Sequence, residues 1–283
     1  MKPAAPSFPP VRRLGLGDLP HCLDLAQDRS WPREERKWRL LLENGEGFGA
    51  DAPDGGLAGT VVLTRYGTTA AAVGMMLVAS RYSGRGLGRR LLTHVLAEAA
   101  DATVFLCATE NGRPLYEKLG FETAGVVEAR VGRFDTGGDP DTTRLGEPGR
   151  DLAALCALDA EVFGADRSHL LARLFAFAEQ VRVAERDGEI TGYGAAWPSG
   201  DKLFVGPIVA EDDATARALV TDLARDADVR IRIDLHPRHE ELIPWLAGRG
   251  LARASTTSFM VHGGRVLPGD RSRLVASFMS ALG

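Results

Sequence analysis

The segment 77–90 reads Leu-Val-Ala-Ser-Arg-Tyr-Ser-Gly-Arg-Gly-Leu-Gly-Arg-Arg and brings three glycines and four arginines together. It follows an apolar stretch that predicts a strand over 70–79 and leads into a pattern that predicts a helix over 88–100. The first N–H groups of a helix have no partner inside it, and the helix dipole adds about half a positive charge there. Because glycines leave these N–H groups open, the segment predicts a site for a phosphate group.

Two common phosphate-binding motifs do not fit this segment. The dinucleotide fingerprint G-x-G-x-x-G fails because Arg89 stands where the third glycine belongs. A Walker loop fails because no Gly-Lys-Ser/Thr follows. An ordinary glycine turn remains as the alternative, but it leaves the alternating glycines and the flanking arginines unexplained.

The sequence resembles the GCN5-related N-acetyltransferase (GNAT) family in two places. Arg81-x-x-Gly84-x-Gly86 is similar to the [Q/R]-x-x-G-x-[G/A] pyrophosphate motif of that family. The segment 111–121, Asn-Gly-Arg-Pro-Leu-Tyr-Glu-Lys-Leu-Gly-Phe, resembles its closing N…Y-x-K-x-G-F element. The resemblance covers about 11–134, and the two motifs together are fairly specific. The whole chain resembles two-domain members whose second half is a divergent copy.

The resemblance implies an α+β fold of tandem GNAT-like domains, each a mixed twisted sheet flanked by helices. It also implies acyl-CoA-dependent N-acyl transfer, with acetyl-CoA as the cosubstrate, to a small-molecule primary amine. Amine and thioester would meet in one ternary complex. The competing interpretation is a CoA-binding sensor or interaction module without catalysis. Neither the acceptor nor the oligomeric state follows from the sequence.

The resemblance further implies which residues hold the cofactor. Backbone groups of 77–79 would pair with the pantetheine arm like an added strand, and one amide would bind the thioester carbonyl. Amides of 83–89 would hold the pyrophosphate. Asn111 would bind the amide region of the cofactor, or else cap a turn. The complete cofactor set is Leu77, Val78, Ala79, Arg81, Ser83, Gly84, Arg85, Gly86, Leu87, Gly88, Arg89 and Asn111.

Tyr116 is the catalytic residue that the resemblance implies. A phenol held near the sulfur can protonate the departing CoA thiolate as negative charge develops there. The alternative is a tyrosine that only packs on a short helix. Many family members carry a glutamate base on the strand before the phosphate loop, whereas 70–79 contains no carboxylate. The carboxylates of Glu34, Glu35 and Glu46 are candidates, and we assign none of them as the base.

Cysteine and histidine add no further chemistry to this interpretation. Cys107 lies on the predicted strand 103–108, but its apolar neighbours predict a packed thiol rather than a nucleophile. His236 and His239 invite a metal site, but Pro237 breaks the helical spacing and no third ligand lies nearby, so we predict no metal.

Composition limits the partners and the compartment. The 283 residues carry a net charge of −4 and no basic tract, which excludes a typical nucleic-acid-binding protein. No apolar run approaches the about 18 residues of a membrane helix, so we expect no membrane partner. Three cysteines without Cys-x-x-Cys spacing, and no secretory signal, predict a cytoplasmic protein with reduced thiols.

An internal repeat suggests how the chain divides. Asp18-Leu19 matches Asp151-Leu152, and the glycine-flanked segment 55–59 matches 188–192, both 133 residues apart. We therefore predict a duplication, with two unrelated α/β domains as the alternative. The predicted parts are a flexible N-terminus (1–10), a catalytic GNAT domain (11–135), a linker (136–143) and a degenerate GNAT-like domain (144–283).

The second half lacks the features that carry chemistry in the first. Where the glycine loop would align, 211–217 reads Glu-Asp-Asp-Ala-Thr-Ala-Arg, and Leu246 stands where Tyr116 would map. A pyrophosphate about 4 Å from a carboxylate is disfavoured by about 4 kcal/mol per pair at an effective dielectric of about 20. We therefore expect this half to bind no CoA there. We expect it instead to bury part of the surface of the first half and to form one wall of the acceptor pocket.

Overall fold

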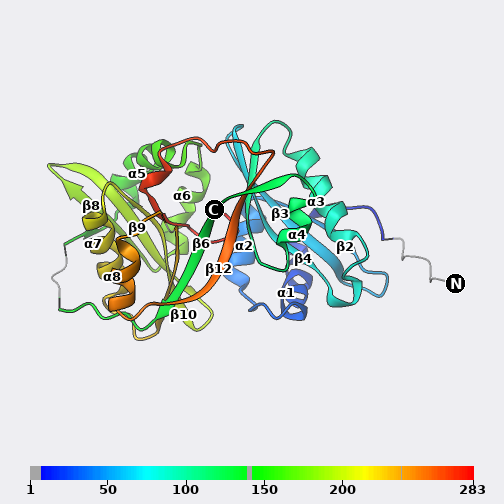
Figure 1. Ribbon diagram of the computed structural model, residues 1–283, viewed down its shortest axis with the longest axis horizontal. Coiled ribbons are helices and arrows are strands. Elements are labelled where there is room, and N and C mark those ends of the chain that lie inside the picture. The colour runs from blue at the N-terminus through cyan, green and yellow to red at the C-terminus, as the bar shows by residue number, and fades with distance from the viewer. Residues whose placement is uncertain (1–7, 139–141, 237) are drawn as a thin grey trace.

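Thirteen strands form a single mixed sheet in the computed structural model, which describes residues 8–138, 142–236 and 238–283 (Figure 1). The predicted strand 70–79, helix 88–100 and strand 103–108 are confirmed as β4, α3 and β5. The elements of the first half are β1 (Arg12–Leu14), η1 (Leu16–Asp18), α1 (Leu19–Asp28), α2 (Glu35–Asn44), β2 (Glu46–Asp51), β3 (Leu57–Tyr66), β4 (Ala70–Val78), η2 (Ser80–Tyr82), α3 (Leu87–Glu98), β5 (Thr103–Ala108), α4 (Arg113–Glu117) and β6 (Phe121–Gly132).

The second half repeats the order of α-helices and strands, though its described residues contain no counterpart of η1 or η2, and it adds a short helix and one strand at its end. Its elements are β7 (Arg144–Leu145), α5 (Pro148–Phe163), α6 (Ser168–Phe177), β8 (Gln180–Arg186), β9 (Glu189–Ser199), β10 (Lys202–Ala210), α7 (Asp213–Ala224), β11 (Arg230–Leu235), α8 (Leu242–Gly248), β12 (Ala252–His262), η3 (Arg271–Arg273) and β13 (Leu274–Ala276).

The two halves exchange their last long strands. The strand order is β1-β2-β3-β4-β5-β12-β6-β11-β13-β10-β9-β8-β7, so β12 of the second half pairs with β5 of the first. In return, β6 of the first half pairs with β11 of the second. The exchange joins both halves into one continuous sheet, and β6 and β12 cross the middle of the molecule (Figure 1).

An approximate two-fold axis relates the halves. Strands β6 and β12 are antiparallel and pair Val127 with Thr257. The register shifts by one residue on each side of this pair, between Arg253 and Ser255 and between Phe259 and Met260. Because two antiparallel strands are related by a two-fold axis perpendicular to their sheet, α1 and α2 lie on the same face as α5 and α6. The predicted α+β fold of tandem, mixed, helix-flanked sheets is confirmed.

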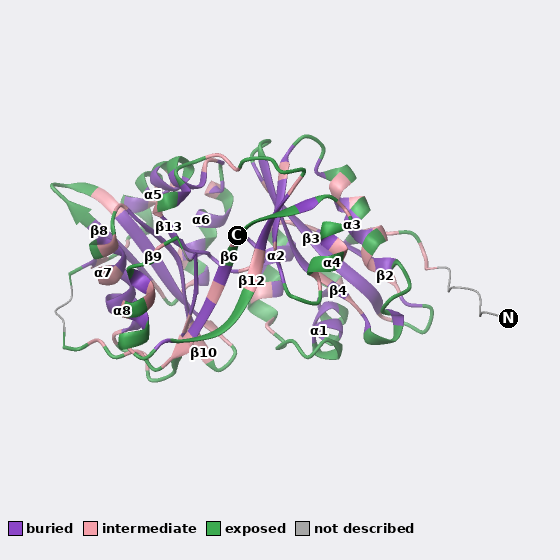
Figure 2. Cartoon of the chain, in the orientation of Figure 1, coloured by how far each residue is buried: buried purple, intermediate pink, exposed green. Residues whose placement is uncertain are grey.

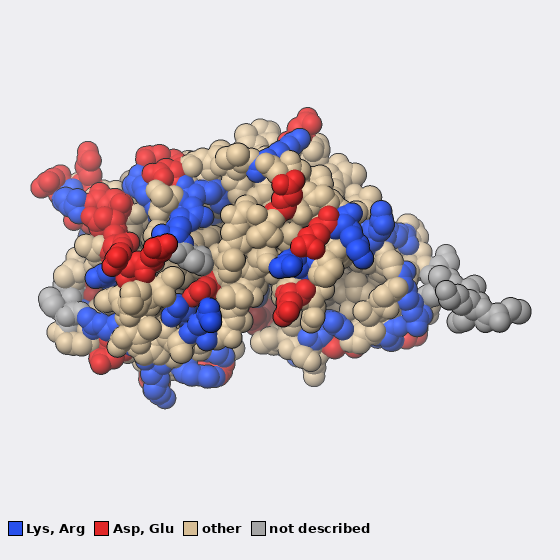
Figure 3. Space-filling model, viewed as in Figure 1, with Lys and Arg blue, Asp and Glu red and all other residues tan. Residues whose placement is uncertain are grey.

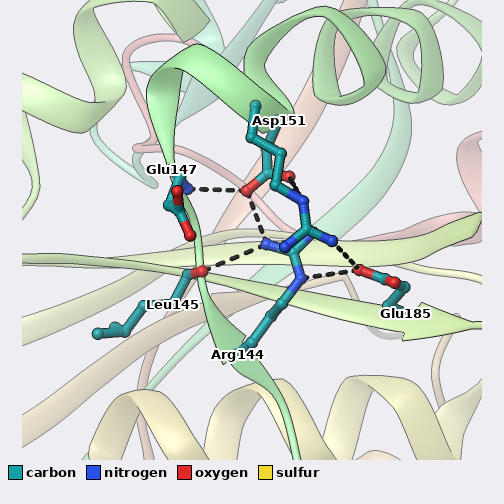
Figure 4. Close-up of polar contacts among 6 residues, drawn as sticks. Arg144, Leu145, Glu147, Asp151 and Glu185 are labelled. Carbon is teal, nitrogen blue, oxygen red and sulfur yellow. Dashed lines mark hydrogen bonds and ion pairs between the residues drawn. The ribbon is translucent and has the colours of Figure 1, made fainter. Parts of the chain in front are cut away.

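An ionic network fixes the start of the second half. Arg144 donates two hydrogen bonds to Asp151, at 2.7 and 2.8 Å, and one to Glu185 at 2.7 Å (Figure 4). Its guanidinium also donates to the carbonyl of Leu145 at 3.3 Å. The carboxylate of Asp151 accepts the N–H of Glu147 at 2.8 Å. One arginine thus ties the edge strand, the first helix and the next strand together.

The first half contains the same network. Arg12 donates to Asp18 at 2.8 Å, to Asp51 at 2.9 Å and to the carbonyl of Arg13 at 3.1 Å. Asp18 accepts the N–H of Gly15 at 3.0 Å. The duplication therefore extends from strand order to individual hydrogen bonds, and the alternative of two unrelated domains is wrong.

The halves also share a hydrophobic core. Tyr66 of β3 is fully buried, and its ring centroid lies 4.9 Å from that of Phe163 of α5. Its hydroxyl donates to the carbonyl of Leu282 at 2.6 Å. Residues 277–283 are almost entirely buried between the halves. Strands β3, β4 and β10 are buried along most of their length, whereas the central strands β6 and β12 are largely exposed or half-buried (Figure 2). Parts of the predicted N-terminal segment and linker, 1–7 and 139–141, lie outside the described residues.

The two arginine networks predict unequal losses of stability. The side chain of Asp151 is 2% exposed and that of Asp18 is 19% exposed. Asp151→Ala should lower the free energy of unfolding by about 2–3 kcal/mol, because it leaves a partly buried arginine short of a partner. Asp18→Ala should cost about 1 kcal/mol, since water replaces part of the lost interaction. Urea unfolding of both variants measures this, and equal losses would contradict the structure.

Candidate active site

A gap in the sheet opens between β4 and β5. The two parallel strands pair only at their first residues, with Ala70 opposite Thr103 and Ala72 opposite Phe105. Beyond this point, no strand of the described residues pairs with 73–78 on the side that faces β5. Backbone N–H and C=O groups of a strand need hydrogen-bond partners when they are removed from water. The edge of β4 can therefore accept an extended ligand as an added strand.

A β-bulge shapes β4 at the mouth of this gap. Thr60 of β3 faces Leu77 whereas Val62 faces Gly74, so β4 carries one residue more than its partner. Met75 takes up the difference with a φ of +49°, and its carbonyl accepts the hydroxyl of Thr60 at 3.0 Å. Bulges redirect the backbone groups next to them, often beside active sites. The apolar pattern of 70–79 predicted a regular strand and gave no sign of this bulge.

The glycine loop places the N-terminus of α3 in solvent at the same end of β4. Gly84 and Gly86 have φ values of +72° and +84°, a conformation that side chains disfavour. Gly86 is the N-cap residue of α3, and the first bond inside the helix runs from the N–H of Arg90 to its carbonyl. A Cβ atom at either glycine would meet nothing within 4 Å. No described atom therefore crowds these two glycines in front of the first turn of α3, which leaves room for an anion there.

Arginines surround this helix N-terminus. Arg81 forms an ion pair with Asp54 at 3.0 Å, and its guanidinium lies 4.8 Å from the ring centroid of Tyr82. Arg85 lies over the same ring at 5.8 Å, and Arg89 is exposed. Basic side chains are visible over the part of the surface where α3 lies (Figure 3). These charges add to the helix dipole in favouring a phosphate.

Not every amide of the loop is available. The N–H of Ser83 donates to the carbonyl of Ser80 at 3.2 Å. The groups that remain open begin at Gly84. The predicted contact from the backbone of Ser83 therefore has a competing partner, whereas its exposed hydroxyl is free to turn.

Helix α4 brings Tyr116 to the same place. A Cβ atom on Gly88 of α3 would lie 3.2 Å from Leu115 and 3.6 Å from Val78. Strand β4, the first turn of α3 and helix α4 thus meet around one glycine. Tyr116, next to Leu115, is 8% exposed and packs edge-on against Phe121 at 5.8 Å. The residues that the sequence analysis grouped by motif are grouped in space as well.

The hydroxyl of Tyr116 is protonated and free of protein partners. Burial raises its pKa to about 12. Among the described residues, none accepts a hydrogen bond from it. A phenol with this pKa holds its proton at neutral pH and can donate it to a neighbouring group on which negative charge develops.

The other polar candidates lie differently. Asn111 is exposed, and Gly112 rather than Asn111 takes the N-cap position of α4. Burial would raise the pKa of Glu34, but Lys37 and the hydroxyl of Ser199 lower it below its usual value. Ser199 Oγ donates to Glu34 at 2.5 Å, so this carboxylate links α2 to the second half.

The remaining two candidate bases are paired with arginines. Glu35 binds Arg39 at 2.9 Å on α2. Glu46 binds Arg13 and Arg65, which lower its pKa against the opposing effect of burial. Neither is free to act as a base.

Comparison with known proteins fits this geometry. Two family models, each described as an acetyltransferase (GNAT) domain, match residues 43–123 and residues 155–276. The uncharacterized N-acetyltransferase YitH of Bacillus subtilis strain 168 is 31% identical over 268 residues, covering 92% of this chain and 94% of the relative. The chain belongs to the GNAT family of acetyltransferases.

Solved structures share the tandem architecture of this GNAT protein. A proposed acetyltransferase of Pyrococcus horikoshii has a TM-score of 0.83 at 18% identity, covering 97% of this chain and 95% of that one. A tandem GNAT protein from the clavulanic acid biosynthesis pathway has a TM-score of 0.66 at 15% identity, covering 91% and 99%. The predicted family, with two GNAT domains in tandem, is confirmed, and the family supports N-acetyltransferase activity in general.

The second GNAT half has the same gap, but its own chain fills it. Strands β10 and β11 also part after three paired residues. The short strand β13 lies between them, with Ala276 paired to Ile208 of β10 and to Leu235 of β11. The strand edge that stays open on β4 is thus paired with protein in this half. Nothing in the sequence of 274–276 had indicated this.

The helix N-terminus of the second half is closed as well. Asp212 caps α7 by accepting the N–H of Thr215 at 2.7 Å. Glu211 and Asp212 both pair with Arg186, so carboxylates occupy the place that the first half leaves open. Leu246, in the position of Tyr116, is buried. These contacts support the expectation that this half binds no CoA at that place.

Three further features of the described residues are relevant to the function. Within the ranges 8–138, 142–236 and 238–283, no group of three or more His, Cys, Asp or Glu side chains could hold a metal ion. In the same ranges, no helix is long and apolar enough to cross a membrane. Burial raises the pKa of the Cys107 thiol to about 12, and Asp234 adds to this effect.

Cys107 should therefore react slowly with alkylating agents. Its thiolate is scarce at pH 8, whereas an unfolded cysteine has a pKa of about 8.5. We expect iodoacetamide to label Cys107 in the native protein at least about a hundredfold more slowly than in the unfolded chain. Mass spectrometry of tryptic peptides over time measures the ratio. Equal rates would show that the thiol is ionised and able to act as a nucleophile.

Proposed function

We propose that the first half, within 11–135, transfers an acetyl group from acetyl-CoA to a small-molecule primary amine by direct attack in a ternary complex. The strongest support for this proposal is that three features of the first half lie close together. The unpaired edge of β4, the open N-terminus of α3 and the protonated Tyr116 meet around Gly88. The second half, with its gap filled, serves as scaffold and wall.

The chain's own groups suit the parts of acetyl-CoA. The unpaired edge of β4 at 77–79 would bind the pantetheine arm through backbone hydrogen bonds. The open amides from Gly84 to Arg89 would hold the pyrophosphate, aided by Arg81 and Arg85. One amide next to the bulge at Met75 would face the thioester oxygen and stabilise the negative charge that develops on it.

Bound acetyl-CoA would supply an acetyl group as a thioester. An uncharged amine would attack the carbonyl carbon of this thioester. Tyr116 would hold its proton at Oη until the C–S bond breaks, then donate it to the sulfur. β4 carries no carboxylate and the three candidate glutamates are paired, so the amine would lose its proton to water. Cys107, with its raised pKa, fits a route without an acyl-enzyme.

A CoA-binding sensor without catalysis is the second candidate. The missing carboxylate on β4 favours it, since no side chain there can remove the proton of the amine. The free hydroxyl of Tyr116 argues for the enzyme. The two differ in steady-state release of CoA, which only the enzyme shows when amines are added. We also propose a cytoplasmic location, which suits the three free cysteines.

Tyr116→Phe tests the proton donor. The change removes one oxygen and keeps the packing against Phe121, so the affinity for acetyl-CoA should stay the same. Turnover should fall by about tenfold or more, because the thiolate would leave unprotonated. Release of CoA with an amine that wild type accepts measures turnover, and calorimetry measures affinity. Unchanged turnover would remove Tyr116 from the mechanism.

Gly86→Asp tests the phosphate site. A carboxylate there would oppose the pyrophosphate and weaken acetyl-CoA binding by about a hundredfold or more. Gly188→Asp is a matched control, since Gly188 has a φ of +83° and a Cβ atom there would also meet nothing within 4 Å. The control should bind acetyl-CoA like wild type. Equal affinities of the two variants would contradict the assigned site.

A further inference from the structure

A separate cavity of about 800 Å³ lies where the exchanged strands meet. Its walls come from the start of β6, from Phe259 and Val261 of β12, from His236 after β11 and from the segment 264–271. Its described lining includes no residue of β4, α3 or α4. Both halves build it, and a volume of about 300–1,000 Å³ is typical of small-molecule sites.

Arg271 lies in the wall of this cavity without a countercharge. It is 9% exposed, and its guanidinium lies 4.2 Å from the ring centroid of Phe163. It donates to the carbonyls of Phe163 at 3.1 Å and Pro268 at 3.2 Å. Within the described part of the chain, no carboxylate lies at ion-pair distance from it. Burying an unpaired charge is costly, so an anion beside Arg271 would be stabilising.

The buried carboxylate of Asp159 already has hydrogen-bond partners of its own. Asp159 receives two hydrogen bonds of 2.7 Å from Arg167, whose guanidinium lies 4.0 Å from the Phe163 ring centroid. The hydroxyl of Tyr193 also donates to Asp159. Burial, and then the charges of Arg167 and Arg238, lower the pKa of Arg271 to about 9. Burial is the main cause of this shift, and the attraction of Asp159 does not offset it, so the charge of Arg271 is poorly compensated by the protein.

Arg238 adds a second cation to the cavity. It donates to the carbonyl of Arg271 at 2.7 Å, which places the two residues side by side. No carboxylate of the described residues pairs with it either. Arg238 is exposed as a residue, and the partial burial of its guanidinium lowers its pKa. His236 next to it is neutral, because burial lowers its pKa to about 3. Glu122 is the carboxylate in the lining, and its side chain is exposed at the rim.

The rest of the wall is apolar. Phe259, Val261 and Leu267 also line the cavity. Guanidinium groups bind carboxylates and phosphates through paired, charge-assisted hydrogen bonds. We propose that this cavity binds a small organic anion, with its carboxylate or phosphate between Arg238 and Arg271 and its apolar body against Phe259 and Val261. GNAT membership does not assign this site.

Three related probes test the proposal on the full chain without acetyl-CoA. Phenylacetate and phenyl phosphate carry an anion on an apolar body, and phenylacetamide is the neutral counterpart of the first. Calorimetry at fixed ionic strength should show that at least one anion binds about tenfold or more tightly than phenylacetamide. The probe that binds more tightly shows whether the site prefers a carboxylate or a phosphate. Equal affinity for the neutral probe, or no binding of either anion, would overturn the proposal.

A variant locates the binding. Arg238→Gln should lower the affinity for the preferred anion by about tenfold or more. The unfolding temperature shows whether the variant remains folded. Arg230→Gln is the control, because Arg230 is exposed and paired with Asp201 at the other end of β11. Binding that survives Arg238→Gln, or falls equally in Arg230→Gln, would overturn the proposal. Since no acetyl-CoA is present, either failure leaves the proposed acetyl transfer untouched.

Discussion

Two parallel strands that part in the middle of a sheet must satisfy the backbone groups that they leave behind. This protein contains that problem twice, once between β4 and β5 and once between β10 and β11. In the second half the chain supplies its own strand, β13, and the gap is closed. In the first half no strand of the described residues fills the gap, and the site is built around that opening.

Duplication of one domain explains why a single chain contains both a filled gap and an open gap. The networks around Arg12 and Arg144 join corresponding elements, because both halves need the edge strand, first helix and next strand connected. They differ in emphasis: Arg12 donates mainly to Asp51 of the next strand, and Arg144 mainly to Asp151 of the first helix. At the helix N-terminus the halves differ: open glycines in one, and a cap by Asp212 in the other. The exchange of β6 and β12 then makes each half incomplete alone, so the second half remains necessary for the fold of the first.

The sequence predicted the local features because they depend on neighbouring residues. Alternating glycines, an apolar strand before them and a periodic helix after them predicted the loop and α3. The spacing of Asp18 and Asp151 predicted the duplication. Three other features depend on distant parts of the chain: the exchange of β6 and β12, β13 in the second gap and the positive φ of Met75. No local pattern encodes which strand an exposed edge will pair with.

The number of acetyl-CoA molecules bound by one chain tests this account most directly. Calorimetry on the full protein should give one equivalent per chain, because only the first gap and helix N-terminus are open. Two equivalents would mean that a second acetyl-CoA molecule displaces β13 from the gap between β10 and β11. No binding at all would mean that the open edge of β4 serves another ligand.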